Sequence, residues 1–173
     1  TMIMSLGLEE SDFHCEGVTR PDVEMRGCND ILPLSCPEAI YGIHKEYLEA
    51  GAQIIESDSF SCNMLTLADY GLESQSYAMS YAAANAARRV VDEWMASHRG
   101  DHRWVAGSIG PSNRSLSMSP DVNDPAARGV DWDTFTDAYR EHIRGLIDGG
   151  ADLLLVETSF DALNLKAILW TIE

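Results

Sequence analysis

Short apolar segments alternate with longer amphipathic segments along this chain, and this alternation constrains its fold more than any other feature. The predicted helices cover residues 37–50, 74–97, 131 or 133 to 148, and 162 to the end. The predicted strands cover residues 54–55, 104–109 and 152–157. Strands that alternate with helices are typical of a parallel sheet covered by helices. Because Leu153–Val156 is continuously apolar, this strand is expected to be buried on both faces.

Two segments about 100 residues apart repeat the same order of features. Glu49–Glu56 and Asp148–Glu157 each run from a helix end, through a glycine-containing turn and an apolar strand, to a glutamate. The second strand is two residues longer, which preserves the side-chain phase because successive residues of a strand alternate faces. The repeat predicts two equivalent helix–strand units in one sheet.

The charge of the chain argues against several classes of partner. It carries 12 basic and 28 acidic residues, for a formal net charge of −16. A surface this acidic repels phosphate backbones and anionic lipids, so we expect no nucleic-acid partner and no membrane partner. No apolar run approaches the roughly 18 residues that a membrane-spanning helix requires.

Neither the cysteines nor the histidines form a metal-binding pattern. The cysteines at positions 15, 28, 36 and 62 match no CxxC pair and no zinc-finger spacing. We expect reduced, partly buried thiols in a cytoplasmic protein, with a disulfide as the main alternative. The five histidines are scattered, without an HxH or HExxH spacing.

Polar residues follow each predicted strand, where the ligand site of a parallel α/β sheet lies. They are Glu56, Asp58 and Ser59, then Ser108, Ser112 and Asn113, then Glu157, Thr158 and Asp161. A carboxylate in such a place needs a partner because burying it alone is costly. That partner is either a ligand ammonium group or an internal basic residue. Asp161 also fits a helix cap, and Asn113 fits a turn after Gly-Pro.

Four segments occur in an order that is specific, although each is weak alone. They are residues 51–60 (GAQIIESDSF), 106–114 (AGSIGPSNR), 119–125 (SPDVNDP) and 150–158 (GADLLLVET). Together with Phe160, Asp161 and Asn164, they resemble the homocysteine-binding module of cobalamin-dependent methionine synthase. The Gly-Pro-Ser-Asn and Ser-Pro-Asp-Val segments favour this enzyme over its betaine-dependent and S-methylmethionine-dependent relatives.

This resemblance implies the first half of a (β/α)8 TIM-type barrel. Residues 1–173 would form a partial homocysteine-binding domain, a fragment of a longer chain. The family's Asp-Gly-Ala turn would precede Thr1, and its zinc-binding cysteines would follow Glu173, so no metal ligand is assigned here. The chain departs from the family at Asp58, where asparagine is usual.

The same resemblance implies methyl transfer. In the family, a methyl group passes from methylcobalamin, recharged by methyltetrahydrofolate, to a zinc-activated homocysteine thiolate and gives methionine. Glu157 would bind the substrate ammonium group, and Asn113 would shape the pocket. Ser57, Asp58 and Ser59 would offer backbone N–H groups and hydroxyls to the substrate carboxylate. No catalytic residue is assigned.

The isolated fragment is expected to be inactive and to bind neither zinc nor cobalamin, which belong to the full-length enzyme. Its expected partners are homocysteine, the other half of the barrel, and the folate, cobalamin and activation modules of the same chain. A half-barrel has unpaired strand edges, so two fragments are expected to pair as a dimer.

Three alternatives stay open from the sequence. The chain could belong to another homocysteine S-methyltransferase. It could be an acidic, flavodoxin-like α/β module for binding or signalling, although such a module places several carboxylates at one strand end. It could also be a half-barrel with a purely structural role.

Overall fold

Three parallel strands form the sheet of this protein in a computed structural model that describes residues 2–173. The central strand is β2 (Trp104–Ile109), flanked by β1 (Ile54–Glu56) and β3 (Leu153–Val156). Both pairings are parallel, as the alternation of strands and helices predicts.

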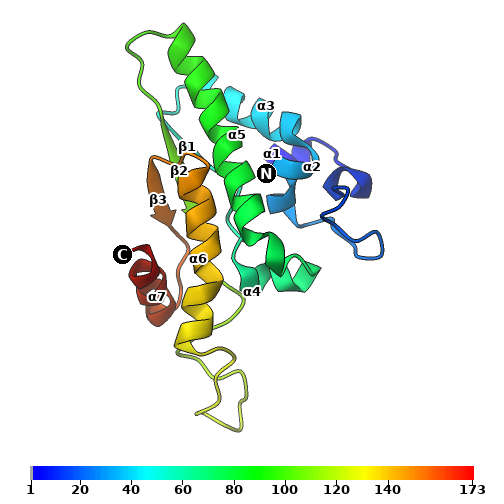
Figure 1. The fold of residues 1–173 in the computed structure, drawn as a ribbon, viewed down its shortest axis with the longest axis vertical. Coiled ribbons are helices and arrows are strands. Elements are labelled where there is room, and N and C mark those ends of the chain that lie inside the picture. The colour runs from blue at the N-terminus through cyan, green and yellow to red at the C-terminus, as the bar shows by residue number, and fades with distance from the viewer. Residues whose placement is uncertain (1) are drawn as a thin grey trace.

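Helices connect and cover these strands. The longer ones are α3 (Pro37–Glu49), α5 (Ser76–Ser97), α6 (Trp132–Asp148) and α7 (Ala162–Ile172). The shorter elements are α1 (Met2–Ser5), η1 (Glu10–Phe13), η2 (Asn29–Ile31), α2 (Leu32–Ser35), α4 (Met64–Leu67), η3 (Ala68–Tyr70) and η4 (Glu73–Gln75). α5 lies between α6 on one side and α2 and α3 on the other (Figure 1). The predicted elements are thus confirmed, and Thr1 of the predicted domain lies outside the described residues.

The helix ends follow from local sequence chemistry. α3 begins at a proline, which loses no hydrogen bond at a first helical position. The side chain of Asp131 accepts a hydrogen bond from the backbone N–H of Thr134 at the start of α6. After α3 and α6, Gly51 and Gly150 adopt positive φ values of 97° and 98°, which glycine tolerates best. The repeated segments therefore share one helix-to-strand turn.

The two faces of the sheet differ in burial. Ile55, Val105 and Ile109 point toward α3, α5 and α6 and are buried. On the other face, Ile54 is 53% exposed and Trp104 is 47% exposed. Leu153 and Leu155 of β3 are 39% and 37% exposed on that face. The prediction that β3 is buried on both faces is therefore wrong within residues 2–173, because no element of these residues covers the second face.

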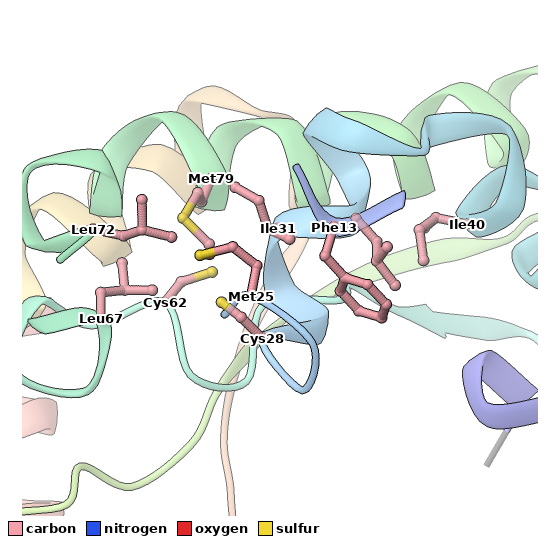
Figure 2. Packing of buried hydrophobic residues seen from close by; sticks show 10 residues of the cluster. Phe13, Met25, Cys28, Ile31, Ile40, Cys62, Leu67, Leu72 and Met79 are labelled. Atoms are coloured by element: carbon pink, nitrogen blue, oxygen red, sulfur yellow. The ribbon is translucent and has the colours of Figure 1, made fainter. Parts of the chain in front are cut away.

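The segment before α3 packs a sulfur-rich core against α2, α4 and α5. Figure 2 shows the sulfur-bearing side chains of Met25, Cys28, Cys62 and Met79 pointing toward one another. All four cysteines are unpaired, which confirms the prediction of free thiols, and Cys28 and Cys62 are buried. Burial, followed by the nearby Asp30 carboxyl, raises the pKa of Cys28 to about 12, so this thiol stays protonated at neutral pH.

Within residues 2–173, no helix combines the length and the apolar character needed to cross a lipid bilayer.

Candidate functional site at the carboxyl ends of the strands

Three polar side chains share the open face of the sheet near the carboxyl ends of its strands. Glu56 pairs in register with Ala106, and Ser108 pairs with Leu155. Because side chains alternate along a strand, Glu56, Ser108 and Glu157 project from the same face. This face and this end of the sheet are where a barrel of this type presents its ligand site.

A buried serine network joins the end of β1 to β2. The backbone N–H of Ser108 donates to Ser57 Oγ at 3.0 Å, and Ser59 Oγ donates to the Ser108 carbonyl at 2.8 Å. The hydroxyls of Ser57 and Ser59 lie 2.7 Å apart. Since the Ser59 proton is already donated, Ser57 donates to Ser59. The network holds the loop after β1 against β2 without a free hydroxyl donor.

This pattern differs from the expectation that both serines offer donors to a substrate carboxylate. The backbone N–H of Ser57 donates to the Ala106 carbonyl at 2.9 Å, and that of Ser59 donates to the Ser57 carbonyl at 3.0 Å. Every donor of these two serines is therefore used internally. The backbone N–H of Asp58 makes no hydrogen bond within residues 2–173, so it stays available to a ligand.

Glu157 is held in place by β2 and by its own backbone. Ser108 Oγ donates to Glu157 Oε1 at 2.5 Å, and the Glu157 N–H donates to the Ile109 carbonyl at 3.0 Å. Thr158 has a φ of 54°, a left-handed conformation that is strained for a β-branched residue. Such strain is found at sites where the chain must turn sharply to aim a neighbouring group. The Glu157 carboxylate is partly exposed and makes no ion pair within residues 2–173.

Glu56 lies close to Glu157. Burial raises the pKa of Glu56, and the negative charge of Glu157 and a hydrogen bond with it raise that pKa further. Glu56 and Ser108 are among the polar residues that the sequence places at the strand ends, although no specific substrate contact was predicted for either. The signal was present, because both stand in the strand phase that puts Glu157 on the open face.

The Asp58 side chain makes no hydrogen bond with the serine network. Its Oδ2 is buried without a hydrogen-bond partner within residues 2–173. Burial, and then the negative charge of Asp30, raises the pKa of Asp58 well above its usual range. Asp30 Oδ1 in turn accepts a hydrogen bond from the Ser61 N–H at 2.7 Å. The structure thus places the Asp58 side chain in a pair of buried carboxyl groups.

Asn113 lies on the exposed surface after β2. Its Nδ2 donates to Asp69 Oδ2 at 2.8 Å, which connects this turn to η3. None of its hydrogen bonds reaches Ser57, Ser59 or Glu157. Its predicted role in shaping the pocket stays a prediction.

Asp161 caps the N-terminus of α7, as its position before a predicted helix indicates. It also binds the long loop between β2 and α6. Its side chain accepts from the Leu163 N–H at 2.9 Å and from Ser115 Oγ at 2.5 Å. Burial alone would raise the pKa of Asp161, but hydrogen bonds from Ser115, Ser117 and Leu163 outweigh it and lower that pKa to about 2.

Replacing Asp161 by alanine is expected to lower the free energy of unfolding by about 1–2 kcal/mol at pH 7. The lowered pKa means that the charged carboxylate stabilises the fold above about pH 4 and that this contribution is lost as the pH falls toward 2. Urea unfolding at pH 7 and pH 3 measures the effect, with the exposed Asp137→Ala as the control. An equal loss at both pH values would contradict the assigned role.

A cavity of about 450 Å³ borders β1 beside this site. Glu56, Ser57 and Asp58 line it from the strand, and His44 of α3 lines it from the opposite side. His44 is only 5% exposed, and its Nε2 has no hydrogen-bond partner within residues 2–173. Burial lowers the pKa of His44 to about 4, so the imidazole is neutral at pH 7. A ligand beside Glu56 would therefore meet no positive charge from this wall.

Residues 2–173 contain no group of three or more His, Cys, Asp or Glu side chains placed to bind a metal ion. Cys28 and Cys62 lie in the apolar core, and Cys15 and Cys36 are only half-buried elsewhere. These residues do not fit the zinc ion that the family resemblance implies.

Parallel strands with helices on one face and polar groups at their carboxyl ends define an α/β fold of the barrel class. The chain belongs to the homocysteine S-methyltransferase family, since the family description "Homocysteine S-methyltransferase" matches residues 2–173. The flavodoxin-like alternative is therefore set aside.

The structure is similar to solved structures of the homocysteine methyltransferase MmuM from Escherichia coli. The oxidised form matches 98% of this chain with a TM-score of 0.71 and 23% identity, which shows a shared fold. The metallated and apo forms each match 85% of the chain, with TM-scores of 0.67 and 0.62 and identities of 27% and 28%. The chain spans 54%, 54% and 49% of the lengths of these three structures, so the predicted partial barrel is confirmed.

Proposed function

We propose that this chain is the homocysteine-binding half of a methyltransferase that converts homocysteine to methionine. The observation that carries the proposal is Glu157, a carboxylate fixed at the strand ends by Ser108 and left without a basic partner within residues 2–173. Such a carboxylate suits a ligand that brings its own positive charge. An amino acid substrate supplies one through its ammonium group.

The roles of the remaining residues follow from their hydrogen bonds. Glu157 accepts hydrogen bonds from the substrate ammonium group. The free backbone N–H of Asp58 donates to the substrate carboxylate, and Ser57 and Ser59 position that loop against β2. A substrate held through the ammonium and carboxylate groups on its α-carbon keeps its thiol side chain free of these contacts.

We extend the proposal to the rest of the protein. The open apolar face around Trp104 and Leu153 supports a second barrel half supplied by further polypeptide, or by a second copy in a dimer. When bound there, zinc would favour the thiolate form of homocysteine. Further modules of the same chain would handle folate, cobalamin and activation.

Methylcobalamin is proposed as the methyl donor, in the manner of methionine synthase, on the strength of the Gly-Pro-Ser-Asn and Ser-Pro-Asp-Val segments. The family match and the likeness to a homocysteine methyltransferase also fit a second candidate, another homocysteine S-methyltransferase. Full-length protein incubated with homocysteine and either methylcobalamin or S-methylmethionine separates the two. Methionine formed only from S-methylmethionine would overturn the cobalamin proposal.

Glu157→Gln in the full-length protein is expected to weaken homocysteine binding about tenfold or more, because it removes a charged hydrogen bond to the ammonium group. Titration calorimetry measures the dissociation constant. The control is Glu46→Gln, an exposed residue of α3 whose side chain has no partner within residues 2–173. Equal affinities for wild type and Glu157→Gln would remove Glu157 from the site, and no homocysteine binding by the wild type would overturn the proposed function.

A further inference from the structure

Four sulfur-bearing side chains, Met25, Cys28, Cys62 and Met79, meet in the apolar core that packs against α2, α4 and α5. All four are buried, and Figure 2 shows their sulfur atoms pointing toward one another. They come from three segments of the chain, namely the turn before η2, the loop after β1, and α5. The site around Glu157 uses none of them.

Backbone hydrogen bonds bring the first two of these segments together. In the turn before η2, the Cys28 N–H donates to the Met25 carbonyl at 2.9 Å, so both sulfur atoms come from one tight turn. The side chain of Asp30 accepts a hydrogen bond from the Ser61 N–H at 2.7 Å. This bond fixes the residues that follow Cys28 beside the residue that precedes Cys62.

Helix α5 adds the fourth sulfur atom. Ser76 Oγ donates to the Cys62 carbonyl at 2.6 Å, which ties the loop after β1 to the start of α5. Met79 follows Ser76 by three residues and therefore lies on the same face of the helix. The convergence of the four sulfur atoms thus follows from hydrogen bonds that hold the three segments in place.

Two thiols and two thioethers form a donor set for a soft cation. Thiolate and thioether sulfur select Cu(I), whereas zinc sites use thiolate, imidazole and carboxylate ligands. Within residues 2–173, no three His, Cys, Asp or Glu side chains are grouped to bind a metal ion, so zinc and hard cations lack a donor set here. The thioethers of Met25 and Met79 are the ligands that make this cluster specific for a soft ion.

A small cavity gives a cation access to the cluster. Its volume is about 150 Å³, and its lining includes Cys28, Asp30, Asp69 and Tyr70. Asp69 is exposed and Cys28 is buried, so the cavity reaches from the surface to one of the four sulfur-bearing side chains. The formal net charge of −16 favours the approach of a cation over that of an anion.

We propose that Met25, Cys28, Cys62 and Met79 bind one Cu(I) ion. This site is separate from the proposed homocysteine site and does not depend on it. On binding, one thiol S–H bond breaks, a Cu–S bond forms, and the proton passes to water. Copper stays Cu(I), so the step needs neither an oxidant nor a reductant. Exchanging one proton for one Cu(I) adds no net charge to the core, where an uncompensated charge would be costly.

The exchange of a proton for the cation makes binding depend on pH. Burial raises the pKa of Cys28 to about 12 and that of Cys62 well above its usual range, so both thiols carry their protons at neutral pH without metal. A thiol must lose its proton to bind the metal as a thiolate. Release of one proton means that Cu(I) affinity should rise about tenfold for each unit of pH between pH 6 and pH 8.

The test measures Cu(I) bound to the full-length protein without oxygen, in competition with the Cu(I) chelator bathocuproine disulfonate. Wild type is expected to bind one more equivalent of Cu(I) than Cys62→Ala. Met79→Leu keeps both thiols and nearly the same side-chain volume, and it should weaken the binding of that equivalent about tenfold or more. The control is Cys15→Ser, because Cys15 is a half-buried thiol outside the cluster.

Two results would overturn the proposal. Equal amounts of bound Cu(I) in wild type and Cys62→Ala would remove the site. An unchanged Cu(I) affinity in Met79→Leu would show that the thioethers only fill the core, and this variant keeps the test valid if Cys62→Ala does not fold. Zinc content is expected to be the same in all variants, and a loss of zinc from Cys62→Ala would contradict a site for a soft ion.

Discussion

Replacing Gly145 by alanine is expected to lower the free energy of unfolding by about 3 kcal/mol. A Cβ at this position would lie 2.5 Å from the Tyr77 carbonyl oxygen and 2.8 Å from Ser80 Cβ, both on α5. These neighbours are helix backbone and a short side chain, so neither can rotate away. α6 would have to move off α5, and this helix pair is the most extensive contact between elements.

A matched control for this change lies on α3. Gly42 is also in a helix, but a Cβ there would meet nothing within 4 Å. Gly42→Ala should therefore raise the free energy of unfolding by up to about 1 kcal/mol, the usual gain of alanine over glycine in a helix. Urea unfolding followed by circular dichroism measures both variants. Two variants of equal stability would contradict the close packing of α5 and α6.

The same packing bears on the site. Tyr139 of α6 donates through its hydroxyl to the Gly110 carbonyl at 3.0 Å, just after β2. A Cβ on Gly107 of β2 would lie only 3.1 Å from Leu146 Cδ1 of α6, so α6 packs closely on this strand. Displacing α6 would therefore shift the strand that carries Ser108. We expect Gly145→Ala to weaken homocysteine binding as well as stability.

Replacing Asp58 by asparagine is expected to raise the free energy of unfolding by about 2 kcal/mol at pH 8. Asp58 is a buried acid beside a second buried acid, Asp30, and its Oδ2 has no partner within residues 2–173. An asparagine amide removes one of the two acids and their mutual repulsion. Asparagine is also the residue that the family resemblance implies here.

The pH dependence of this effect has a definite sign. Burial raises the pKa of Asp58 in the folded state above its unfolded value, so the folded state keeps a proton that the unfolded chain releases above about pH 4. Stability therefore falls as the pH rises from this point in the wild type. The advantage of Asp58→Asn should grow with pH and be smallest below about pH 4, where Asp58 becomes protonated in both states.

Urea unfolding from pH 4 to pH 8 measures this difference, with Asp22→Asn as the control. Asp22 is exposed and pairs only with Arg20 at the surface, so its replacement should change stability by less than about 0.5 kcal/mol. A loss of stability in Asp58→Asn at pH 8 would refute the buried acid pair. Homocysteine affinity should persist in this variant, because the proposed contact uses the Asp58 backbone N–H.

Local sequence signals predict the elements of the fold and the position of Glu157 at the end of a strand. Helical periodicity, a proline at the start of α3 and the Gly51 and Gly150 turns are local signals, because they depend on neighbours within a few residues. The position of Glu157 could be predicted for the same reason, since it directly follows an apolar strand. The family's motif order then identified a partial barrel.

Which polar groups come together depends instead on how the strands and loops pack. The Glu56–Glu157 pair joins residues about 100 positions apart, and their approach depends on strand register and twist that no local pattern encodes. Asp58 stands between two serines in the sequence, yet its carboxyl makes no hydrogen bond with them, and its pKa is raised by burial and by the charge of Asp30, which is distant in sequence. Burial and charge are properties of the assembled fold, so these pairings follow from packing.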